Sequence, residues 1–359
     1  MPSWESLIRI APSNGWGSVG TIARQGMYLY ADSENLDFGA VVTENDKKLT
    51  GMRESAVETF GVDRWEPKGG IVFQPRVDDI LPILMAHFQN VVKSGVGTYT
   101  FFRNPNPVQY VTSGNDYCVG TVIGSMGTAG TGRSVYSVDI DLFFGNSFIN
   151  TAVGSQCNGI RYNNAIVDKL TLGMKYGEDV LCTPEFKIYN GDYFAYPSDF
   201  NSVPGKYGSF SQNTRLVDYH GTVVIAGESF SIDSWQGNFN NNTSDKKSLG
   251  YAGISAFPMA GRYTVDGSFD MELQRDLAVL AEGLFGSLNV NIFASASNRI
   301  QIVSPNIAYR AFNIQLSGGQ DVIELSRPYR AYPPSGTTGP STQVTVYTGT
   351  TYATSLYGF

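Results

Sequence analysis

A glycine-rich segment has the spacing of a phosphate-binding loop. Residues 127–134 read Gly-Thr-Ala-Gly-Thr-Gly-Arg-Ser, which matches G-x-x-x-x-G-K-[ST] except that Arg133 replaces the lysine. Such a loop requires a strand before it and a helix after it, so that backbone amides and the helix N-terminus face the phosphates. Residues 135–144, which follow, instead alternate as a strand does. We therefore interpret residues 127–134 as the Gly-rich loop of a hairpin.

Two acidic patterns could also support chemistry. Asp139 and Asp141 would share one face of a strand, and paired carboxylates hydrolyse glycosidic bonds. No further carboxylate can be placed opposite them, and alternating acidic residues are typical of a solvated strand face. Residues 266–272, Asp-Gly-Ser-Phe-Asp-Met-Glu, are sparser in oxygen ligands than a twelve-residue calcium loop. We interpret them as a turn followed by an edge strand.

Histidine and cysteine are scarce. His87 falls in an expected helix beside an apolar position, so we expect partial burial rather than metal ligation, and no Ser or Cys partner can be nominated for His220. Cys118, Cys157 and Cys182 lack metal-ligand spacing and are expected to be small buried apolar residues. The sequence therefore predicts no catalytic, cofactor-binding or metal-binding residue, and a protein that is not an enzyme.

Composition narrows the class of protein further. The 359 residues include 25 basic and 32 acidic ones, giving a net charge of −7, which argues against tight nucleic-acid binding. Forty glycines and an aromatic content of 13% favour turn-rich β-structure over disorder. No apolar run approaches the ~20 residues that cross a bilayer, and the first residues do not resemble a signal peptide. We expect a chain that folds in a reducing cytoplasm and does not enter a membrane.

Hydrophobic patterning predicts a mainly β protein with two short helices. Residues 78–93 have helical spacing, with Asp78 or Asp79 as the N-cap and Pro82 in the first turn, and residues 276–285 form a similar stripe. The clearest strand patterns lie at residues 70–73, 98–102, 135–144, 169–174, 221–225, 289–293 and 344–347.

Several of these features recur about 200 residues apart. Asp46-Lys47-Lys48, followed by a glycine, recurs as Asp245-Lys246-Lys247. A Gly-led strand at Gly70 and the first expected helix recur as Gly267 and the second expected helix. This order predicts two copies of one β-rich unit, at residues 1–165 and 166–332, followed by a linker and an uncharged C-terminal hairpin tail at 333–359. Chance similarity between Gly-rich β segments is the alternative. The tail is too small to be stable alone, so it needs a docking surface on its own chain or on a neighbour.

The order of motifs resembles that of the major tail tube proteins of long-tailed (siphovirus-type) bacteriophages. The resemblance covers about residues 10–330 and rests on the order and general residue character of the segments, not on an invariant motif. The tail after Pro340 departs from it. The segments that carry it are residues 11–21 with their Trp-Gly pair, 28–36, 65–73, 162–174, 249–254 and 261–270.

The resemblance implies a fold and a function. It implies tail-tube β-sandwich or barrel units, each with one short flanking helix, whose sheets join those of neighbours into rings around a lumen. The rings stack into the hollow tail tube that conducts phage DNA, a cargo that acidic subunits would not hold. A duplicated unit implies three chains in a pseudo-sixfold ring, and a spurious repeat implies six. The implied partners are further copies of the chain, the tape measure protein and other tail proteins, in a virion tail assembled in the host cytoplasm.

The polar segment at residues 36–55 and its counterpart at residues 235–255 are the expected contacts between stacked rings. The residues expected there are Thr43, Glu44, Asn45, Asp46, Lys47, Lys48, Asp245, Lys246 and Lys247.

Two other classes remain open. A secreted-type carbohydrate-binding or carbohydrate-cleaving β-sandwich would explain the aromatic content, but it should carry a secretory signal and a clustered acid pair. A non-tube virion component, or a secretion-system tube protein with a related fold, is the other alternative.

Overall fold

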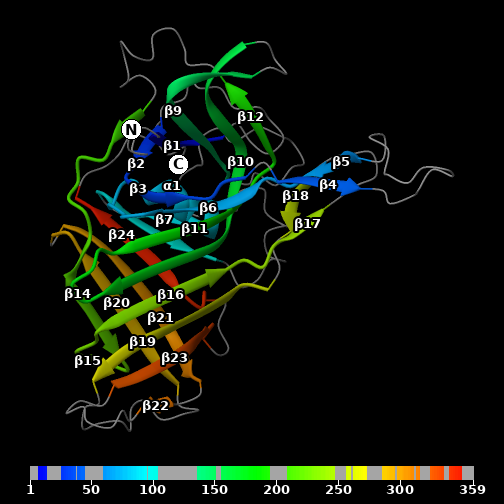
Figure 1. Cartoon of the computed structure of the whole chain (residues 1–359). Coiled ribbons are helices and arrows are strands. Elements are labelled where there is room, and N and C mark those ends of the chain that lie inside the picture. Colours follow the sequence, from blue (N-terminus) through cyan, green and yellow to red (C-terminus); the bar gives the residue numbers. More distant parts are fainter. Residues whose placement is uncertain are drawn as a thin grey trace.

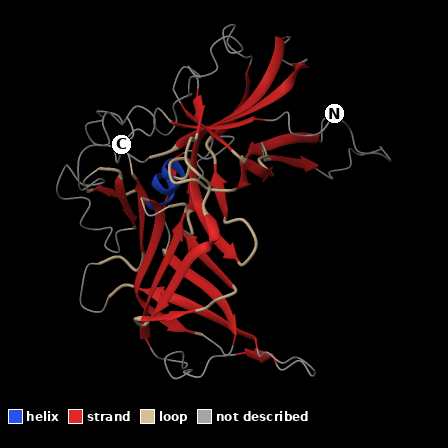
Figure 2. Ribbon diagram, turned by 90° about the vertical axis from the view of Figure 1, so that its left-hand side faces the viewer, coloured by secondary structure: helices blue, strands red, loops and turns tan. Residues whose placement is uncertain are grey.

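The computed structural model has an elongated shape built almost entirely of strands (Figures 1 and 2). It describes residues 7–13, 26–37, 39–44, 60–94, 96–103, 136–150, 155–194, 208–246, 256–259, 262–272, 285–295, 297–310, 313–315, 324–334 and 339–349. Within these residues there is one α-helix, so the mainly β prediction is confirmed. The helix lies inside, where an upper group of strands meets a larger lower body (Figure 2).

The upper group, which we call the upper sheet, runs in the order β13–β2–β1–β9–β10–β12. Neighbours are antiparallel except β13 and β2, which are parallel. Ile8, Ile10 and Ile140 of this sheet are buried in the main hydrophobic core. The bounds of its strands are β1 Leu7–Pro12, β2 Gly26–Leu29, β9 Val138–Asn150, β10 Ser155–Lys175, β12 Asn190–Phe194 and β13 Gly208–Phe210.

Strand β10 connects the upper sheet to the lower body. Over its 21 residues it pairs first with β9 and β12, then from Ile166 with β11 and from Lys169 with β16. The register shifts between Tyr162 and Ala165, and Asn164 has φ 56°. Asparagine tolerates this left-handed conformation, and such an irregularity lets a strand change direction and partners.

The lower body has two layers that cross one another (Figure 1). One runs in the order β3–β6–β11–β10–β16–β19–β23, with β22 beside β23. The other contains β15, β14, β20, β21, β24, β8 and β7. The bounds not yet given are β3 Ala31–Glu34, β6 Lys68–Phe73, β7 Val91–Lys93, β8 Thr98–Phe102, β11 Leu181–Lys187, β14 Val217–Ile225, β15 Glu228–Phe230, β16 Ser234–Asn240, β19 Thr264–Glu272, β20 Phe285–Phe293, β21 Asn298–Tyr309, β22 Asn313–Gln315, β23 Glu324–Tyr332 and β24 Gln343–Thr348.

Strand β21 passes from one layer to the other. Its residues 298–303 pair with β24, and its residues 306–309 pair with β23. Ile300 and Ile302 are buried, and the alternation then breaks at Pro305 before Ile307 is buried. Proline has no N–H for the ladder, so it suits the point where a strand leaves one set of partners for another. The two layers thereby enclose one continuous core.

Helix α1 spans Leu81–Phe88, and all eight residues are buried. The prediction of a helix over residues 78–93 was wrong at both ends. The N-cap is Ile80, without a side-chain cap, because Asp79 Oδ1 accepts a hydrogen bond from the backbone N–H of Arg76 (2.8 Å) and Asp78 accepts one from the Ser211 hydroxyl. At the other end Gln89 is left-handed (φ 64°), and strand β7 follows.

Most other predicted elements are strands in the structure. The segments at 70–73, 98–102, 169–174, 221–225, 289–293 and 344–347 all lie within strands, and the 135–144 segment becomes β9 from Val138. Residues 276–284 of the second expected helix lie outside the described residues, and Phe285 begins β20.

A strand–hairpin–strand arrangement occurs twice. Strands β3 and β6 pair, and the hairpin β4 (Ala40–Glu44) and β5 (Phe60–Trp65) is inserted between them. Strands β16 and β19 likewise pair around the hairpin β17 (Ser244–Lys246) and β18 (Ala256–Met259). Both hairpins project from the same side of the molecule (Figure 1). Gly70 of β6 and Gly267 of β19 are both closely approached by backbone: a Cβ there would lie 2.9 Å from Pro184 O of β11 and 2.4 Å from Gln236 O of β16, respectively. The duplication itself stays a prediction.

The C-terminal segment docks on its own chain. Strand β24 lies between β8 and β21, antiparallel to both. Val344 and Val346 are fully buried, and the Thr345 and Thr100 hydroxyls are 3.0 Å apart. Residues 350–359, the other half of the expected hairpin tail, lie outside the described residues.

Candidate functional site

A row of directly opposed residues crosses the upper sheet. It runs Asp192–Arg161–Asp141–Arg9–Tyr28–Phe210, from β12 through β10, β9, β1 and β2 to β13. Opposed residues on neighbouring strands point to the same face and interact directly. We call these six residues the transverse row.

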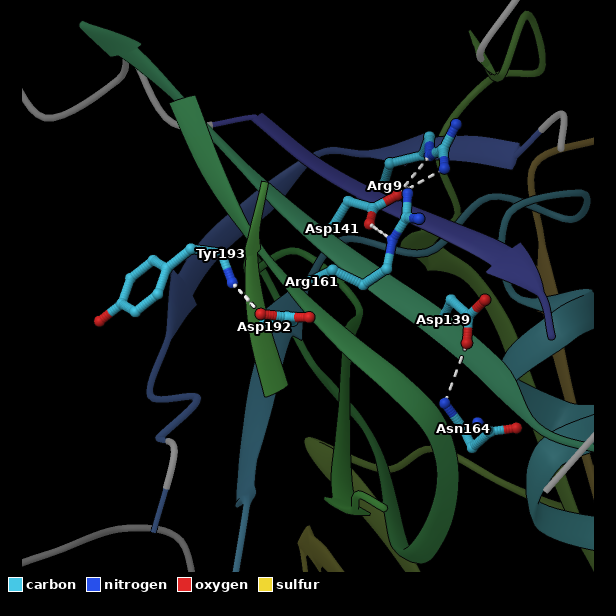
Figure 3. Close-up of polar contacts among 7 residues, drawn as sticks. All are labelled: Arg9, Asp139, Asp141, Arg161, Asn164, Asp192 and Tyr193. Carbon is cyan, nitrogen blue, oxygen red and sulfur yellow. Dashed lines mark hydrogen bonds and ion pairs between the residues drawn. The ribbon is translucent and has the colours of Figure 1, made fainter. Parts of the chain in front are cut away.

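The centre of the transverse row is a buried ion-pair triad (Figure 3). Arg9 Nη2 lies 2.5 Å and Arg9 Nε 2.8 Å from Asp141 Oδ2, and Arg161 Nε lies 2.5 Å from Asp141 Oδ1. The exposed fractions of Arg9, Asp141 and Arg161 are 1%, 0% and 7%. One carboxylate therefore bridges two guanidiniums in a site shielded from water, where Coulomb interactions are strong.

The prediction of a solvated face at Asp139 and Asp141 was wrong, because both are buried. Asp139 Oδ1 accepts a hydrogen bond from the backbone N–H of Asn164 (2.9 Å), and Asn164 Oδ1 accepts one from Ser13 Oγ (2.5 Å). These partners come from β10 and the end of β1, which local alternation along β9 does not reveal. Hydrogen-bonding and ion-pair partners within the protein therefore replace water around both carboxylates.

Arg9 and Arg161 are functional candidates that sequence reasoning missed. Arg9 stands between Ile8 and Ile10 in an apolar run, and an isolated arginine in such a run is a signal of a buried pair. The signal identifies Arg9 but not its partner, which is 132 residues away.

His87 is fully buried, not partly buried as expected. Its Nδ1 lies 3.2 Å from Val167 O and 3.2 Å from Asn241 Nδ2, and its ring packs against Phe88 and Phe239. Burial, with a smaller effect of the Arg103 charge, lowers the pKa of His87 from 6.5 to about 3. The imidazole is therefore neutral across the physiological range.

This histidine should make the protein less stable in acid. Its folded pKa lies below its unfolded pKa, so the unfolded chain binds a proton that the folded chain excludes between pH 6.5 and about 3. From about pH 7 to about pH 5 the wild type should lose about 2 kcal/mol of unfolding free energy more than His87→Gln does. Urea unfolding of both proteins at the two pH values measures the difference. The comparison cancels Asp79, whose pKa is raised by burial and acts in the opposite direction. Equal pH dependence of the two proteins would contradict the assignment.

The expected calcium-like segment lies in an interior strand, so the prediction of an edge strand there was wrong. Strand β19 pairs with β16 on one side and β23 on the other. Asp266 Oδ1 lies 2.9 Å from Arg330 Nε and 3.5 Å from Arg310 Nη2. Its carboxylate is engaged by guanidiniums and not arranged for a cation.

A polar groove of about 570 Å³ lies at the base of the β4–β5 hairpin. Lys169 Nζ lies 2.8 Å from Glu185 Oε2, and Asp168 Oδ1 accepts hydrogen bonds from Thr243 N (2.8 Å) and Oγ1 (2.7 Å), which ties the groove to the start of β17. Phe186 is only 2% exposed and offers no face on which a sugar could stack. The charged residues lining the groove are Glu34, Asp37, Lys68, Asp168, Lys169, Glu185 and Lys187.

Those of the expected ring-to-ring residues that the structure describes lie on the two hairpins. Thr43 and Glu44 end β4, and Asp245 and Lys246 lie in β17. Asn45, Asp46, Lys47, Lys48 and Lys247 lie outside the described residues.

The remaining candidates have the following places. Residues 127–134 and Cys118 are outside the described residues, as are the side chains of Cys157 in β10 and His220 in β14. Cys182 is buried, as expected, and burial raises the pKa of its thiol. In the part of the chain that the structure describes, no helix is long and apolar enough to cross a membrane.

No protein-family model matches the chain, and no curated protein matches it. Its function is therefore inferred from its own residues and fold.

Proposed function

We propose that the chain is a structural subunit that self-associates into rings, which stack into a hollow tube like the tail tube of long-tailed phages. The observation that carries the proposal is the repeated strand–hairpin–strand arrangement. Two hairpins extend beyond the body on one side, each between strands that are paired within the body. A hairpin with no body strand beside it gains stability when it packs against another surface, because an isolated two-stranded hairpin is marginal in water.

The charges support contacts between protein copies over contacts with nucleic acid. The groove at the hairpin base carries both signs, and Lys169 there pairs with Glu185 across neighbouring strands (2.8 Å). A net charge of −7 repeated around a ring would repel phosphates from the lumen. Such a tube passes DNA without holding it, and the tape measure protein and other tail proteins are its further partners in this proposal.

Electron microscopy of the purified full chain tests the proposal. We expect rings or long hollow rods, with three chains and six similar lobes per ring if the unit is duplicated. Six identical chains per ring would retain the tube and remove the duplication. A chain that stays monomeric at high concentration by light scattering would contradict the proposed function.

The hairpin role is tested in the same assay. Deleting residues 43–48 should leave a folded chain whose rings no longer stack, because the described residues that it removes are Thr43 and Glu44 at the end of β4, outside the body. An unchanged circular dichroism spectrum controls for folding. Rods of normal length from this variant would contradict a role in ring-to-ring contact.

A further inference from the structure

The two ends of the transverse row differ in chemistry, and both lie on terminal strands of the upper sheet. Among the described strands, β12 pairs with β10 alone and β13 pairs with β2 alone. Asp192 on β12 is exposed. From Arg9 through Asp141 and Arg161 to Asp192, the sign of the charge alternates from one strand to the next. A basic group close to Asp192 on a neighbouring surface would continue this alternation, because opposite charges near one another on paired strands stabilise the pair.

The β13 end carries aromatic rings and an arginine. Phe210 and Tyr30 are 37% and 40% exposed, and their ring centroids are 4.9 Å apart. The Arg76 guanidinium lies 4.0 Å from the Tyr30 ring centroid, and its Nη1 donates hydrogen bonds to Ser211 O (3.2 Å) and Asn213 O (2.8 Å). Tyrosine and arginine are the residue types most enriched at the energetic centres of protein interfaces.

The strand directions allow the two ends to meet in different copies. Following the pairings across the sheet, β12 and β13 run in the same direction. A neighbouring copy in the same orientation would therefore place its β13 parallel to β12. Within one chain the two strands are separated by five strand spacings, about 24 Å, so they cannot pair with each other.

We propose that β12 of one copy pairs in parallel with β13 of the next copy, which brings Asp192 beside Phe210, Tyr30 and Arg76 of its neighbour. The occupant is a second copy because the acidic end and the aromatic, basic end belong to the same chain and are complementary. The contact is head-to-tail, and repetition of such a contact closes into a ring when the rotation allows. This inference rests on the proposed self-association and specifies the surface that performs it.

Charge reversal tests the electrostatic part. Asp192→Arg and Arg76→Glu should each lower ring yield at least tenfold in electron micrographs. Mixing the two variants should restore association between unlike chains, measured by light scattering and not by ring yield, because a three-chain ring cannot alternate them. Mixing restores complementarity because one variant then has two basic ends and the other two acidic ends. Glu178→Lys is the matched control, since it changes an exposed carboxylate in the turn after β10. Equal ring yields from Asp192→Arg and the control would overturn the inference.

Covalent capture tests the geometry independently of how Arg76→Glu folds. Neighbouring strands lie about 4.8 Å apart, so the Cα atoms of opposed residues on the paired strands come within disulfide range. Oxidised chains carrying both Asp192→Cys and Phe210→Cys should form a ladder of dimers, trimers and larger species on a non-reducing gel. Either single variant, which controls for the three native cysteines, should stop at dimers. No ladder from chains that still form tubes would overturn the inference and leave the proposed function standing, and no assembly of the unmodified chain would overturn both.

Discussion

Replacing Asp141 with asparagine should lower the free energy of unfolding by about 3–5 kcal/mol, because it leaves two guanidiniums facing each other in a buried site. The side chain keeps its size, so the loss comes from charge and not from a cavity. The introduced amide could accept one hydrogen bond through its oxygen, but its NH₂ group would face the second guanidinium. Urea unfolding at neutral pH measures the loss.

Two further variants isolate the cause. Glu185→Gln removes the partner of Lys169 in an exposed pair, and it should cost at most about 1 kcal/mol. The triple change Arg9→Met, Asp141→Leu and Arg161→Met replaces the whole triad by apolar side chains and should be far less costly than Asp141→Asn alone. A loss below about 1 kcal/mol for Asp141→Asn would show that the triad does not hold the three strands together.

Replacing Val344 with aspartate should cost at least about 4 kcal/mol, because it removes a buried apolar side chain and places a carboxylate among apolar ones. Val344 is fully buried in β24, between Phe101 of β8 and Ile302 of β21 in the strand register. The loss should show as a lower urea midpoint or as insoluble protein.

The neighbouring residue provides the matched control. Gln343 lies on the same strand but is exposed, so Gln343→Asp should change stability by less than about 0.5 kcal/mol. Equal effects of the two substitutions would mean that β24 is not an interior strand in solution.

Local pattern was sufficient for the strand segments that it predicted, although many of the described strands were not among them. The segments around Val72, Thr171 and Val290 alternate or form short apolar runs between turn residues, and each became a strand. The helix ends were not predictable in this way. Asp79 does not cap α1, because its carboxylate accepts a hydrogen bond from the backbone N–H of Arg76, which precedes the helix. At the other end, Gln89 ends the helix in a left-handed conformation that glycine usually adopts.

The burial of the Asp141 carboxylate could not be predicted from spacing either. Asp141 has the sequence context of a solvated strand residue, and only the distant Arg9 and Arg161 explain its place in the interior. Likewise, the alternation at residues 344–347 predicted a strand but not that it would lie between β8 and β21. Both outcomes depend on pairing between segments far apart in the chain.

The length of β10 also has a mechanical consequence. This strand is flanked along its course by β9 and β12, then by β11 and β16. A pull along its axis would load many backbone hydrogen bonds in shear at the same time, so no single bond would open first. The ladder is interrupted at Asn164, but buried hydrogen bonds to Asp139 and from Ser13 hold this residue in place. The molecule is thus built to resist stretching along this strand.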